Sequence, residues 1–296
     1  MPKARSAEKP HVHRFKTPTP VTAAVSIEVG TVRVLATERT DTVVTVLPGV
    51  QDRPADVKAA EQTQVDCANG TLRVRAPRTR ALFGKTPSIA VEIEVPAGSL
   101  LEGRSSVGEF DCRGRFSEVR VRASVGDIRV GHADTVHLGT GHGSVTADHV
   151  EGNAEVTTGS GEIRLGTVGG TGTVKSSNGD IRVDDITGAL NLRVANGNVT
   201  VGRARSAVTS RTANGGVRLD EVIRGKVTVE TSAGNIEVGV RDGSAAWLDV
   251  NSTLGRVETD LADADGPGDA GETVEVRART TIGSITVRRA AGTPPH

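Results

Sequence analysis

The chain reads "SSNGDIRV" at residues 176–183, and two variants of this octapeptide follow at a constant interval: "VANGNVTV" (194–201) and "TANGGVRL" (212–219). All three keep a glycine at the fourth position, with apolar residues two and four positions after it. A phrase that returns at a fixed interval, with some letters kept and others changed, indicates a structural repeat.

A glycine equivalent to Gly179 anchors each copy of the repeat. Successive anchors are almost evenly spaced as far as Gly234, and the intervals that lead to Gly255 and then to Gly283 are longer. Looser copies surround Gly30 and Gly70. The regular anchors, which we interpret as structural repeat glycines, are Gly108, Gly126, Gly143, Gly161, Gly179, Gly197, Gly215, Gly234, Gly255 and Gly283.

Polarity alternates around each anchor, as expected of a strand with one buried face. The residue two after the glycine is apolar in all ten copies, and the residue four after it is apolar in all but one, where Thr259 stands. A second alternating segment, such as Leu190 and Leu192, precedes the glycine. Serine or threonine lies three residues before it in eight of the ten copies, which suits a tight corner because a hydroxyl can bond nearby backbone groups.

Two short strands in every copy of the repeat fit either antiparallel hairpins or the stacked coils of a solenoid. The uniform repeat length favours coils, and so does the match between equivalent residues that parallel ladders need. A further apolar residue after the second strand, such as Ile186, forms a third inward wall. The sequence therefore predicts an all-β fold: a single-stranded β-solenoid (β-helix) of about 18-residue coils rather than a meander or a propeller.

The repeat divides the chain into four parts. Residues 1–20 and 291–296 are predicted to be disordered tails. Residues 21–104 are less regular, and we interpret them as longer coils that cap the solenoid; residues 105–290 form its regular part. An acidic, glycine-rich insertion at 260–273 accounts for the long final interval between Gly255 and Gly283.

Composition excludes several classes of protein. The 36 Lys and Arg residues balance 36 Asp and Glu residues, so the basic excess of a general nucleic-acid binder is absent. The sequence contains no apolar run long enough for a membrane span, and no signal-peptide pattern follows its basic N-terminus. We therefore expect a soluble, cytoplasmic protein that is a monomer or a small oligomer.

The corner pattern Ser/Thr-x-x-Gly-x-Ile/Val-x-Val, repeated between Gly108 and Gly283 and preceded by "VEIEVPAG" (91–98), resembles the bacterial putative-adhesin family. That family is a domain of unknown function known for its β-strand repeats. The resemblance runs from about residue 21 to about residue 290. It implies a β-solenoid with a non-enzymatic role, and it supplies no catalytic residues.

Histidines gather in one part of the chain. His132 and His149 both lie six residues after an anchor glycine, so they should stack on neighbouring coils. Stacked imidazoles can converge on zinc, whereas His137 and His142 should point elsewhere. We expect no cofactor and no metal site tighter than micromolar, with His132 and His149 as weak candidates.

Charged and thiol side chains give two further candidate groups. An arginine column three residues after the glycine, which includes Arg164 and Arg182, should be neutralised by neighbouring acidic residues. Cys67 and Cys112 should be small buried thiols, and Trp247 should face outward.

These patterns favour a non-catalytic β-solenoid that acts as a scaffold or binding protein for a protein or glycan partner. The alternative is a polymer-forming cytoskeletal protein similar to the bactofilins. A polysaccharide-acting β-helix enzyme is disfavoured, because no recurring acidic pair or Ser-His-Asp order stands out from the repeat.

Overall fold

The computed structural model describes residues 11–77, 86–261 and 271–290. The chain forms two compact units, Met1–Asp127 and Ile128–His296. Strands dominate both, and the described residues contain one helix, α1 (Pro54–Glu61), which is too short to cross a membrane. The predicted all-β solenoid is confirmed by the parallel stacking described below.

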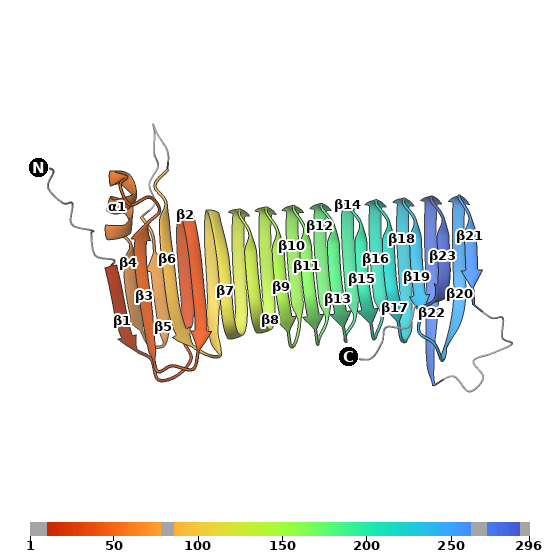
Figure 1. Ribbon diagram of the computed structural model, residues 1–296, viewed down its shortest axis with the longest axis horizontal. Coiled ribbons are helices and arrows are strands. Elements are labelled where there is room, and N and C mark those ends of the chain that lie inside the picture. The colour runs from red at the N-terminus through yellow and green to blue at the C-terminus, as the bar shows by residue number, and fades with distance from the viewer. Residues whose placement is uncertain (1–10, 78–85, 262–270, 291–296) are drawn as a thin grey trace, which may run out of the picture. The chain divides into compact units, whose positions relative to one another are not determined.

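The second unit consists of coils with two strands each. Strands two apart in the chain pair in parallel, for example β10 with β12 and β11 with β13, so each coil stacks on the one before it (Figure 1). The strands are β8 (Ile128–His142), β9 (Val145–Val150), β10 (Ala154–Ser160), β11 (Ile163–Val168), β12 (Gly172–Asn178), β13 (Ile181–Ile186), β14 (Leu190–Asn196), β15 (Val199–Ala204), β16 (Val208–Asn214), β17 (Val217–Val222), β18 (Gly225–Ala233), β19 (Ile236–Val240), β20 (Ser244–Leu254), β21 (Val257–Asp260), β22 (Glu272–Ile282) and β23 (Ile285–Arg289).

The apolar positions of the repeat form the core of this unit. Ile163, Ile181 and Val199 are direct neighbours in one ladder, and each is at most 1% exposed. The third inward wall is also confirmed, because Ile186 and its equivalents are buried. Outside the end coil, the sequence thus identified correctly which side chains enclose the interior.

The corners need glycine for two reasons. Gly179 has φ 127°, a backbone conformation that side chains rarely adopt, and a Cβ added there would lie 2.2 Å from the carbonyl oxygen of Gly161. Some corner hydroxyls also bond the neighbouring coil: the Thr231 hydroxyl donates to the Gly215 carbonyl at 3.0 Å, and the Thr280 hydroxyl donates to the Gly234 carbonyl at 3.0 Å.

The last two coils stack out of chain order. Strands β22 and β23 pair directly with β18 and β19, and β20 and β21 then pair with β22 and β23. The long final interval of the repeat therefore connects neighbouring coils in reversed order; residues 262–270 of the acidic insertion lie outside the described residues. The coil formed by β20 and β21 ends the described stack, so Leu248 and Val250 are half-buried and Val257 is 43% exposed.

The first unit combines coil-like and hairpin pairing. Its strands are β1 (His11–Lys16), β2 (Thr22–Thr37), β3 (Asp41–Pro48), β4 (Gln64–Ala68), β5 (Thr71–Arg75), β6 (Ile89–Pro96) and β7 (Ser99–Val125). The long strand β2 pairs in parallel with β5, β6 and β7, which places Gly30 beside Gly108. In contrast, β3 pairs antiparallel with β1 and β6.

Two expectations for the first unit are wrong. The copy at Gly70 is no coil corner: Asn69 (φ 49°) and Gly70 (φ 71°) turn the antiparallel hairpin of β4 and β5, where two positive φ angles match the twist of the strands. The tail expected over residues 1–20 is also too long, because His11–Lys16 already form β1 against β3. Residues 1–10 and 291–296 lie outside the described residues, and the boundary at 104/105 stays a prediction.

A buried carboxylate, which the sequence did not reveal, holds α1 in place. Asp56 is fully buried and accepts hydrogen bonds from the backbone N–H groups of Val50 and Ser88 and from the Ser88 hydroxyl, at 3.0–3.1 Å. It also forms an ion pair with Arg53. Burial alone would raise the pKa of Asp56, but Arg53 and the other donors outweigh it and hold the pKa below its usual value.

Candidate functional site

A groove of about 950 Å³ crosses the outer face of the second unit. Its walls come from the ladder formed by β10, β12, β14, β16, β18, β22 and β20, so the groove runs from coil to coil, across the strands. Because the repeat places equivalent residues in register, each kind of lining side chain forms a row along the groove.

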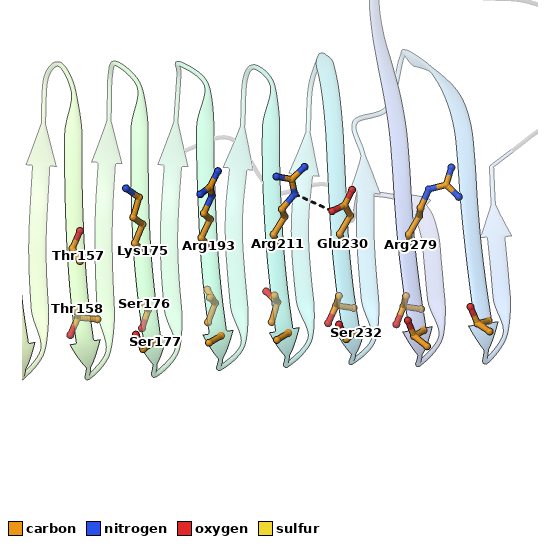
Figure 2. Close-up of a pocket in the computed structure, with 18 of the residues that line it drawn as sticks. Thr157, Thr158, Lys175, Ser176, Ser177, Arg193, Arg211, Glu230, Ser232 and Arg279 are labelled. Atoms are coloured by element: carbon orange, nitrogen blue, oxygen red, sulfur yellow. Dashed lines mark hydrogen bonds and ion pairs between the residues drawn. The ribbon is translucent and has the colours of Figure 1, made fainter.

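A row of mostly basic residues lines one side. Lys175, Arg193 and Arg211 lie four residues before successive corner glycines and are direct neighbours in the parallel register. Figure 2 shows them at the same level on successive strands, with Glu230 and Arg279 continuing the row. Adjacent members are separated by the rung spacing of about 4.8 Å.

Two of these cations lack an ionic partner. Arg211 pairs with Glu230 at 3.0 Å and Arg279 with Asp249 at 2.9 Å, but the described residues offer Lys175 and Arg193 no ion pair or hydrogen bond. Like charges directly opposite each other in a ladder destabilise it. Repulsion between adjacent cations in the row therefore lowers the stability of the folded protein without a ligand. An anion bound beside the row would relieve this repulsion.

Small side chains line the groove beside this row. Ser177, Ala195, Ala213 and Ser232 lie two positions further along their strands than the row residues, and all four are exposed. They leave space for an extended ligand, and the hydroxyls can donate to it. Glu230, the one carboxylate among the described lining residues, is engaged with Arg211, so the described part of the groove offers no carboxylate pair for glycoside hydrolysis.

The arginine column considered from the sequence lies on the other ladder and is neutralised, as expected. Arg164 pairs with Glu162 at 3.1 Å and Arg182 with Asp184 at 2.9 Å. Thr200 also interrupts the column between Arg182 and Arg218. The basic row of the groove lies four residues before the corner glycine, not three residues after it. The lack of acidic residues beside Lys175 and Arg193 in the sequence could have indicated this row, but it was not recognised.

The structure brings His132 and His149 together, as their positions in the repeat predicted, and adds Glu151. His137 and His142 are not part of this cluster; His137 instead contacts Glu155 at 3.3 Å. The absence of a tight metal site stays a prediction.

The thiols differ from each other. Cys112 is fully buried as predicted, and burial raises the pKa of its thiol. The prediction for Cys67 is wrong, because the β4–β5 hairpin leaves this residue half-buried. Trp247 is 57% exposed and faces outward as predicted.

Comparison with known proteins gives a family but no activity. Matching solved structures include a putative cell adhesion protein from Clostridium sporogenes, with 10% identity, a TM-score of 0.25, and coverage of 95% of this chain and 100% of that chain. A putative adhesin from Bacteroides fragilis and a putative lipid binding protein from Parabacteroides distasonis each show 13% identity, a TM-score of 0.32, and coverage of 95% of this chain and 97% of the other. No curated protein matches the sequence.

The family resemblance predicted from the repeat is confirmed by the match to a family model. Residues 55–292 match the family described as Toastrack DUF4097. The match covers the first unit from residue 55 onward and all of the described coils of the second unit. The chain therefore belongs to the Toastrack DUF4097 family.

Proposed function

We propose that the chain is a non-catalytic binding protein whose groove takes a linear polyanion. The observation that carries this proposal is the run of Lys175, Arg193 and Arg211 on adjacent rungs, with Lys175 and Arg193 unpaired among the described residues. Equal spacing favours a ligand whose negative charges also repeat.

The spacing favours an anionic glycan over other polyanions. Side chains on one face of an extended peptide recur at roughly 6.7 Å, twice the rise of a strand, so an acidic peptide would drift out of step with rungs about 4.8 Å apart. A sugar unit in an extended chain has nearly the length of one rung. The zero net charge of the chain also disfavours nucleic acid. A polyuronate therefore fits the row best.

Binding of alginate oligosaccharides tests the proposal, with neutral dextran oligosaccharides as the ligand control. The double variant Lys175→Glu/Arg193→Glu should weaken alginate binding at least tenfold in calorimetric titration at low salt. The matched control is Arg164→Glu/Arg182→Glu, which makes the same charge change at the same spacing on the other ladder, where both arginines are ion-paired. This control should bind within about twofold of the parent protein.

Two results would overturn the proposal. Equal weakening by both double variants would show that alginate responds to overall charge rather than to the groove. Absence of saturable alginate binding by the parent protein at low salt would exclude the polyuronate class.

We infer a second candidate function, the polymer-forming one, from the end coil. Val257 is 43% exposed and Leu248 and Val250 are only half-buried, although all three occupy inward positions of the strands that end the described stack. A solenoid end that none of the described residues covers offers a second copy of the chain a place to stack. Sedimentation over a concentration series distinguishes the two functions: discrete small species support the binding protein, and filaments support the polymer.

The cytoplasmic location stays a prediction from the sequence.

A further inference from the structure

The strongest feature outside the groove is the cluster of His132, His149 and Glu151 at an outer corner of the second unit. Each residue offers one potential ligand atom, and the three atoms lie within 4.8 Å of one another. The two imidazole rings meet edge to face, with their centroids 4.7 Å apart. His132 Nε2 lies 3.0 Å from the Glu151 carboxylate.

The fold holds these side chains on a rigid framework. His132 in β8 and His149 in β9 are register partners in a parallel ladder, and Glu151 follows the end of β9 by one residue. The neighbouring corner residues Ala133 and Val150 are fully buried, which fixes the backbone on which the ligands stand. Little ordering of the chain is therefore needed to bring the three groups together.

The ligand set suits a transition-metal ion. Zinc binds imidazole nitrogen at 2.0–2.1 Å and carboxylate oxygen at 2.0–2.2 Å, so tetrahedral ligand atoms lie roughly 3.4 Å apart. The observed separations need only small side-chain rotations to reach this distance. Two imidazoles with one carboxylate favour Zn²⁺ or Co²⁺, whereas Ca²⁺ and Mg²⁺ prefer all-oxygen sites.

A further contact orients one of the imidazoles. His149 Nδ1 lies within hydrogen-bond distance of the Thr167 hydroxyl on the next coil. When Nδ1–H donates to this hydroxyl, the lone pair lies on Nε2, which is the arrangement that metal-bound histidines usually have.

We propose that His132, His149 and Glu151 form a zinc-class site that links the coils of β8 and β9, with water completing the coordination. Three solvent-accessible ligands give weaker binding than the closed four-ligand sites of structural zinc proteins. The dissociation constant should therefore lie in the micromolar range. This site lies outside the groove and does not depend on the polyanion proposal.

Titration of the full chain with ZnCl₂ and with CoCl₂ tests the site. The expected result is one saturable site per chain, with the visible absorption of tetrahedral cobalt and a rise in melting temperature on adding zinc. The His132→Ala/His149→Ala variant should lose this site, and Glu151→Gln should weaken it at least threefold. CaCl₂ should produce no saturable signal.

His137→Ala is the matched control, because His137 also contacts a glutamate on the neighbouring coil but belongs to no three-ligand cluster of the described residues. This variant should bind zinc as the parent protein does. The proposal is overturned if the parent protein binds no zinc below millimolar concentration, if the double histidine variant keeps the site, or if His137→Ala weakens binding as much as Glu151→Gln does. All these side chains are exposed or half-exposed, so their replacement should leave folding intact, which circular dichroism would verify.

Discussion

Placing one new carboxylate at two adjacent positions of the opening repeat tests which face of the strand is buried. Ile181 is 1% exposed and lies between Ile163 and Val199 in the ladder. Arg182, the next residue, faces water and pairs with Asp184 at 2.9 Å. Ile181→Asp and Arg182→Asp introduce the same side chain, the first on the inward face of the strand and the second on its outward face.

The expected costs differ several-fold. Truncating a buried isoleucine costs about 2–5 kcal/mol, and burying a carboxyl group without partners adds to this, so Ile181→Asp should cost at least about 4 kcal/mol. Arg182→Asp removes an exposed ion pair of about 0.2–1 kcal/mol, and repulsion from Asp184 is offset in part by Arg164 on the neighbouring rung. Its cost should stay near 1 kcal/mol.

Thermal unfolding followed by circular dichroism measures both variants. For a unit of this size, 1 kcal/mol corresponds to roughly 2–4 °C, so Ile181→Asp should melt about 8 °C or more below the parent protein. Arg182→Asp should melt within about 4 °C of it. The native spectrum should show β structure with almost no helix. Comparable melting temperatures for the two variants would refute the inward assignment.

Three further predictions concern other parts of the chain. Asp56→Asn should lower the free energy of unfolding by about 2–3 kcal/mol, because it weakens the contacts that hold α1. The pKa of Asp56 is held low, so the stabilisation by its carboxylate is present at neutral pH and is lost as the pH falls below about 4. The melting temperatures at pH 7 and pH 3 should therefore differ less in the variant than in the parent protein. A thiol reagent should modify half-buried Cys67 in the native protein and Cys112 only after unfolding, as mass spectrometry would show; prompt native labelling of Cys112 would contradict its buried position. Gly179→Ala should destabilise far more than Gly243→Ala in the same melting assay, since both glycines have positive φ but only Gly179 meets a neighbouring carbonyl; equal effects would mean that backbone strain alone matters.

The coils could be predicted from the sequence because every copy of the repeat shows the same pattern of apolar and polar residues. Period-two alternation around the anchor glycine defines the buried face. The inward assignment of Ile181 is supported by the apolar residues at the equivalent positions of the neighbouring coils. The hairpin at Gly70 was misread because Asn-Gly serves equally well in a solenoid corner and in a two-residue hairpin turn. Only the pairing partner, which a short stretch does not contain, decides between them.

Much of the candidate site was harder to predict because it depends on relations across coils. The row of Lys175 and Arg193 becomes visible only when equivalent positions of successive repeats are aligned and each is checked for acidic neighbours. Glu151 escaped notice for a similar reason: it follows a corner, where the alternation of the strand no longer fixes the direction of a side chain. His132 and His149, in contrast, occupy equivalent repeat positions, so their contact was predictable.

The reversed order of the last two coils has a physical reason that the sequence contains. Thr259 is the one polar residue at the inward position four after the glycine, and it is exposed in the end coil. The coil of β22 and β23 places Val276, Ile285 and Val287 inward instead, and all three are fully buried. If the coils stacked in chain order, Thr259 would lie inside the stack, where an unbonded hydroxyl costs about 1–3 kcal/mol, and an apolar coil would be left at the end. The corner pattern alone permits either order, because Gly255 and Gly283 present equivalent corners. Burial of the more apolar coil therefore selects the observed order, and the long interval between these two glycines supplies the chain length that this order requires.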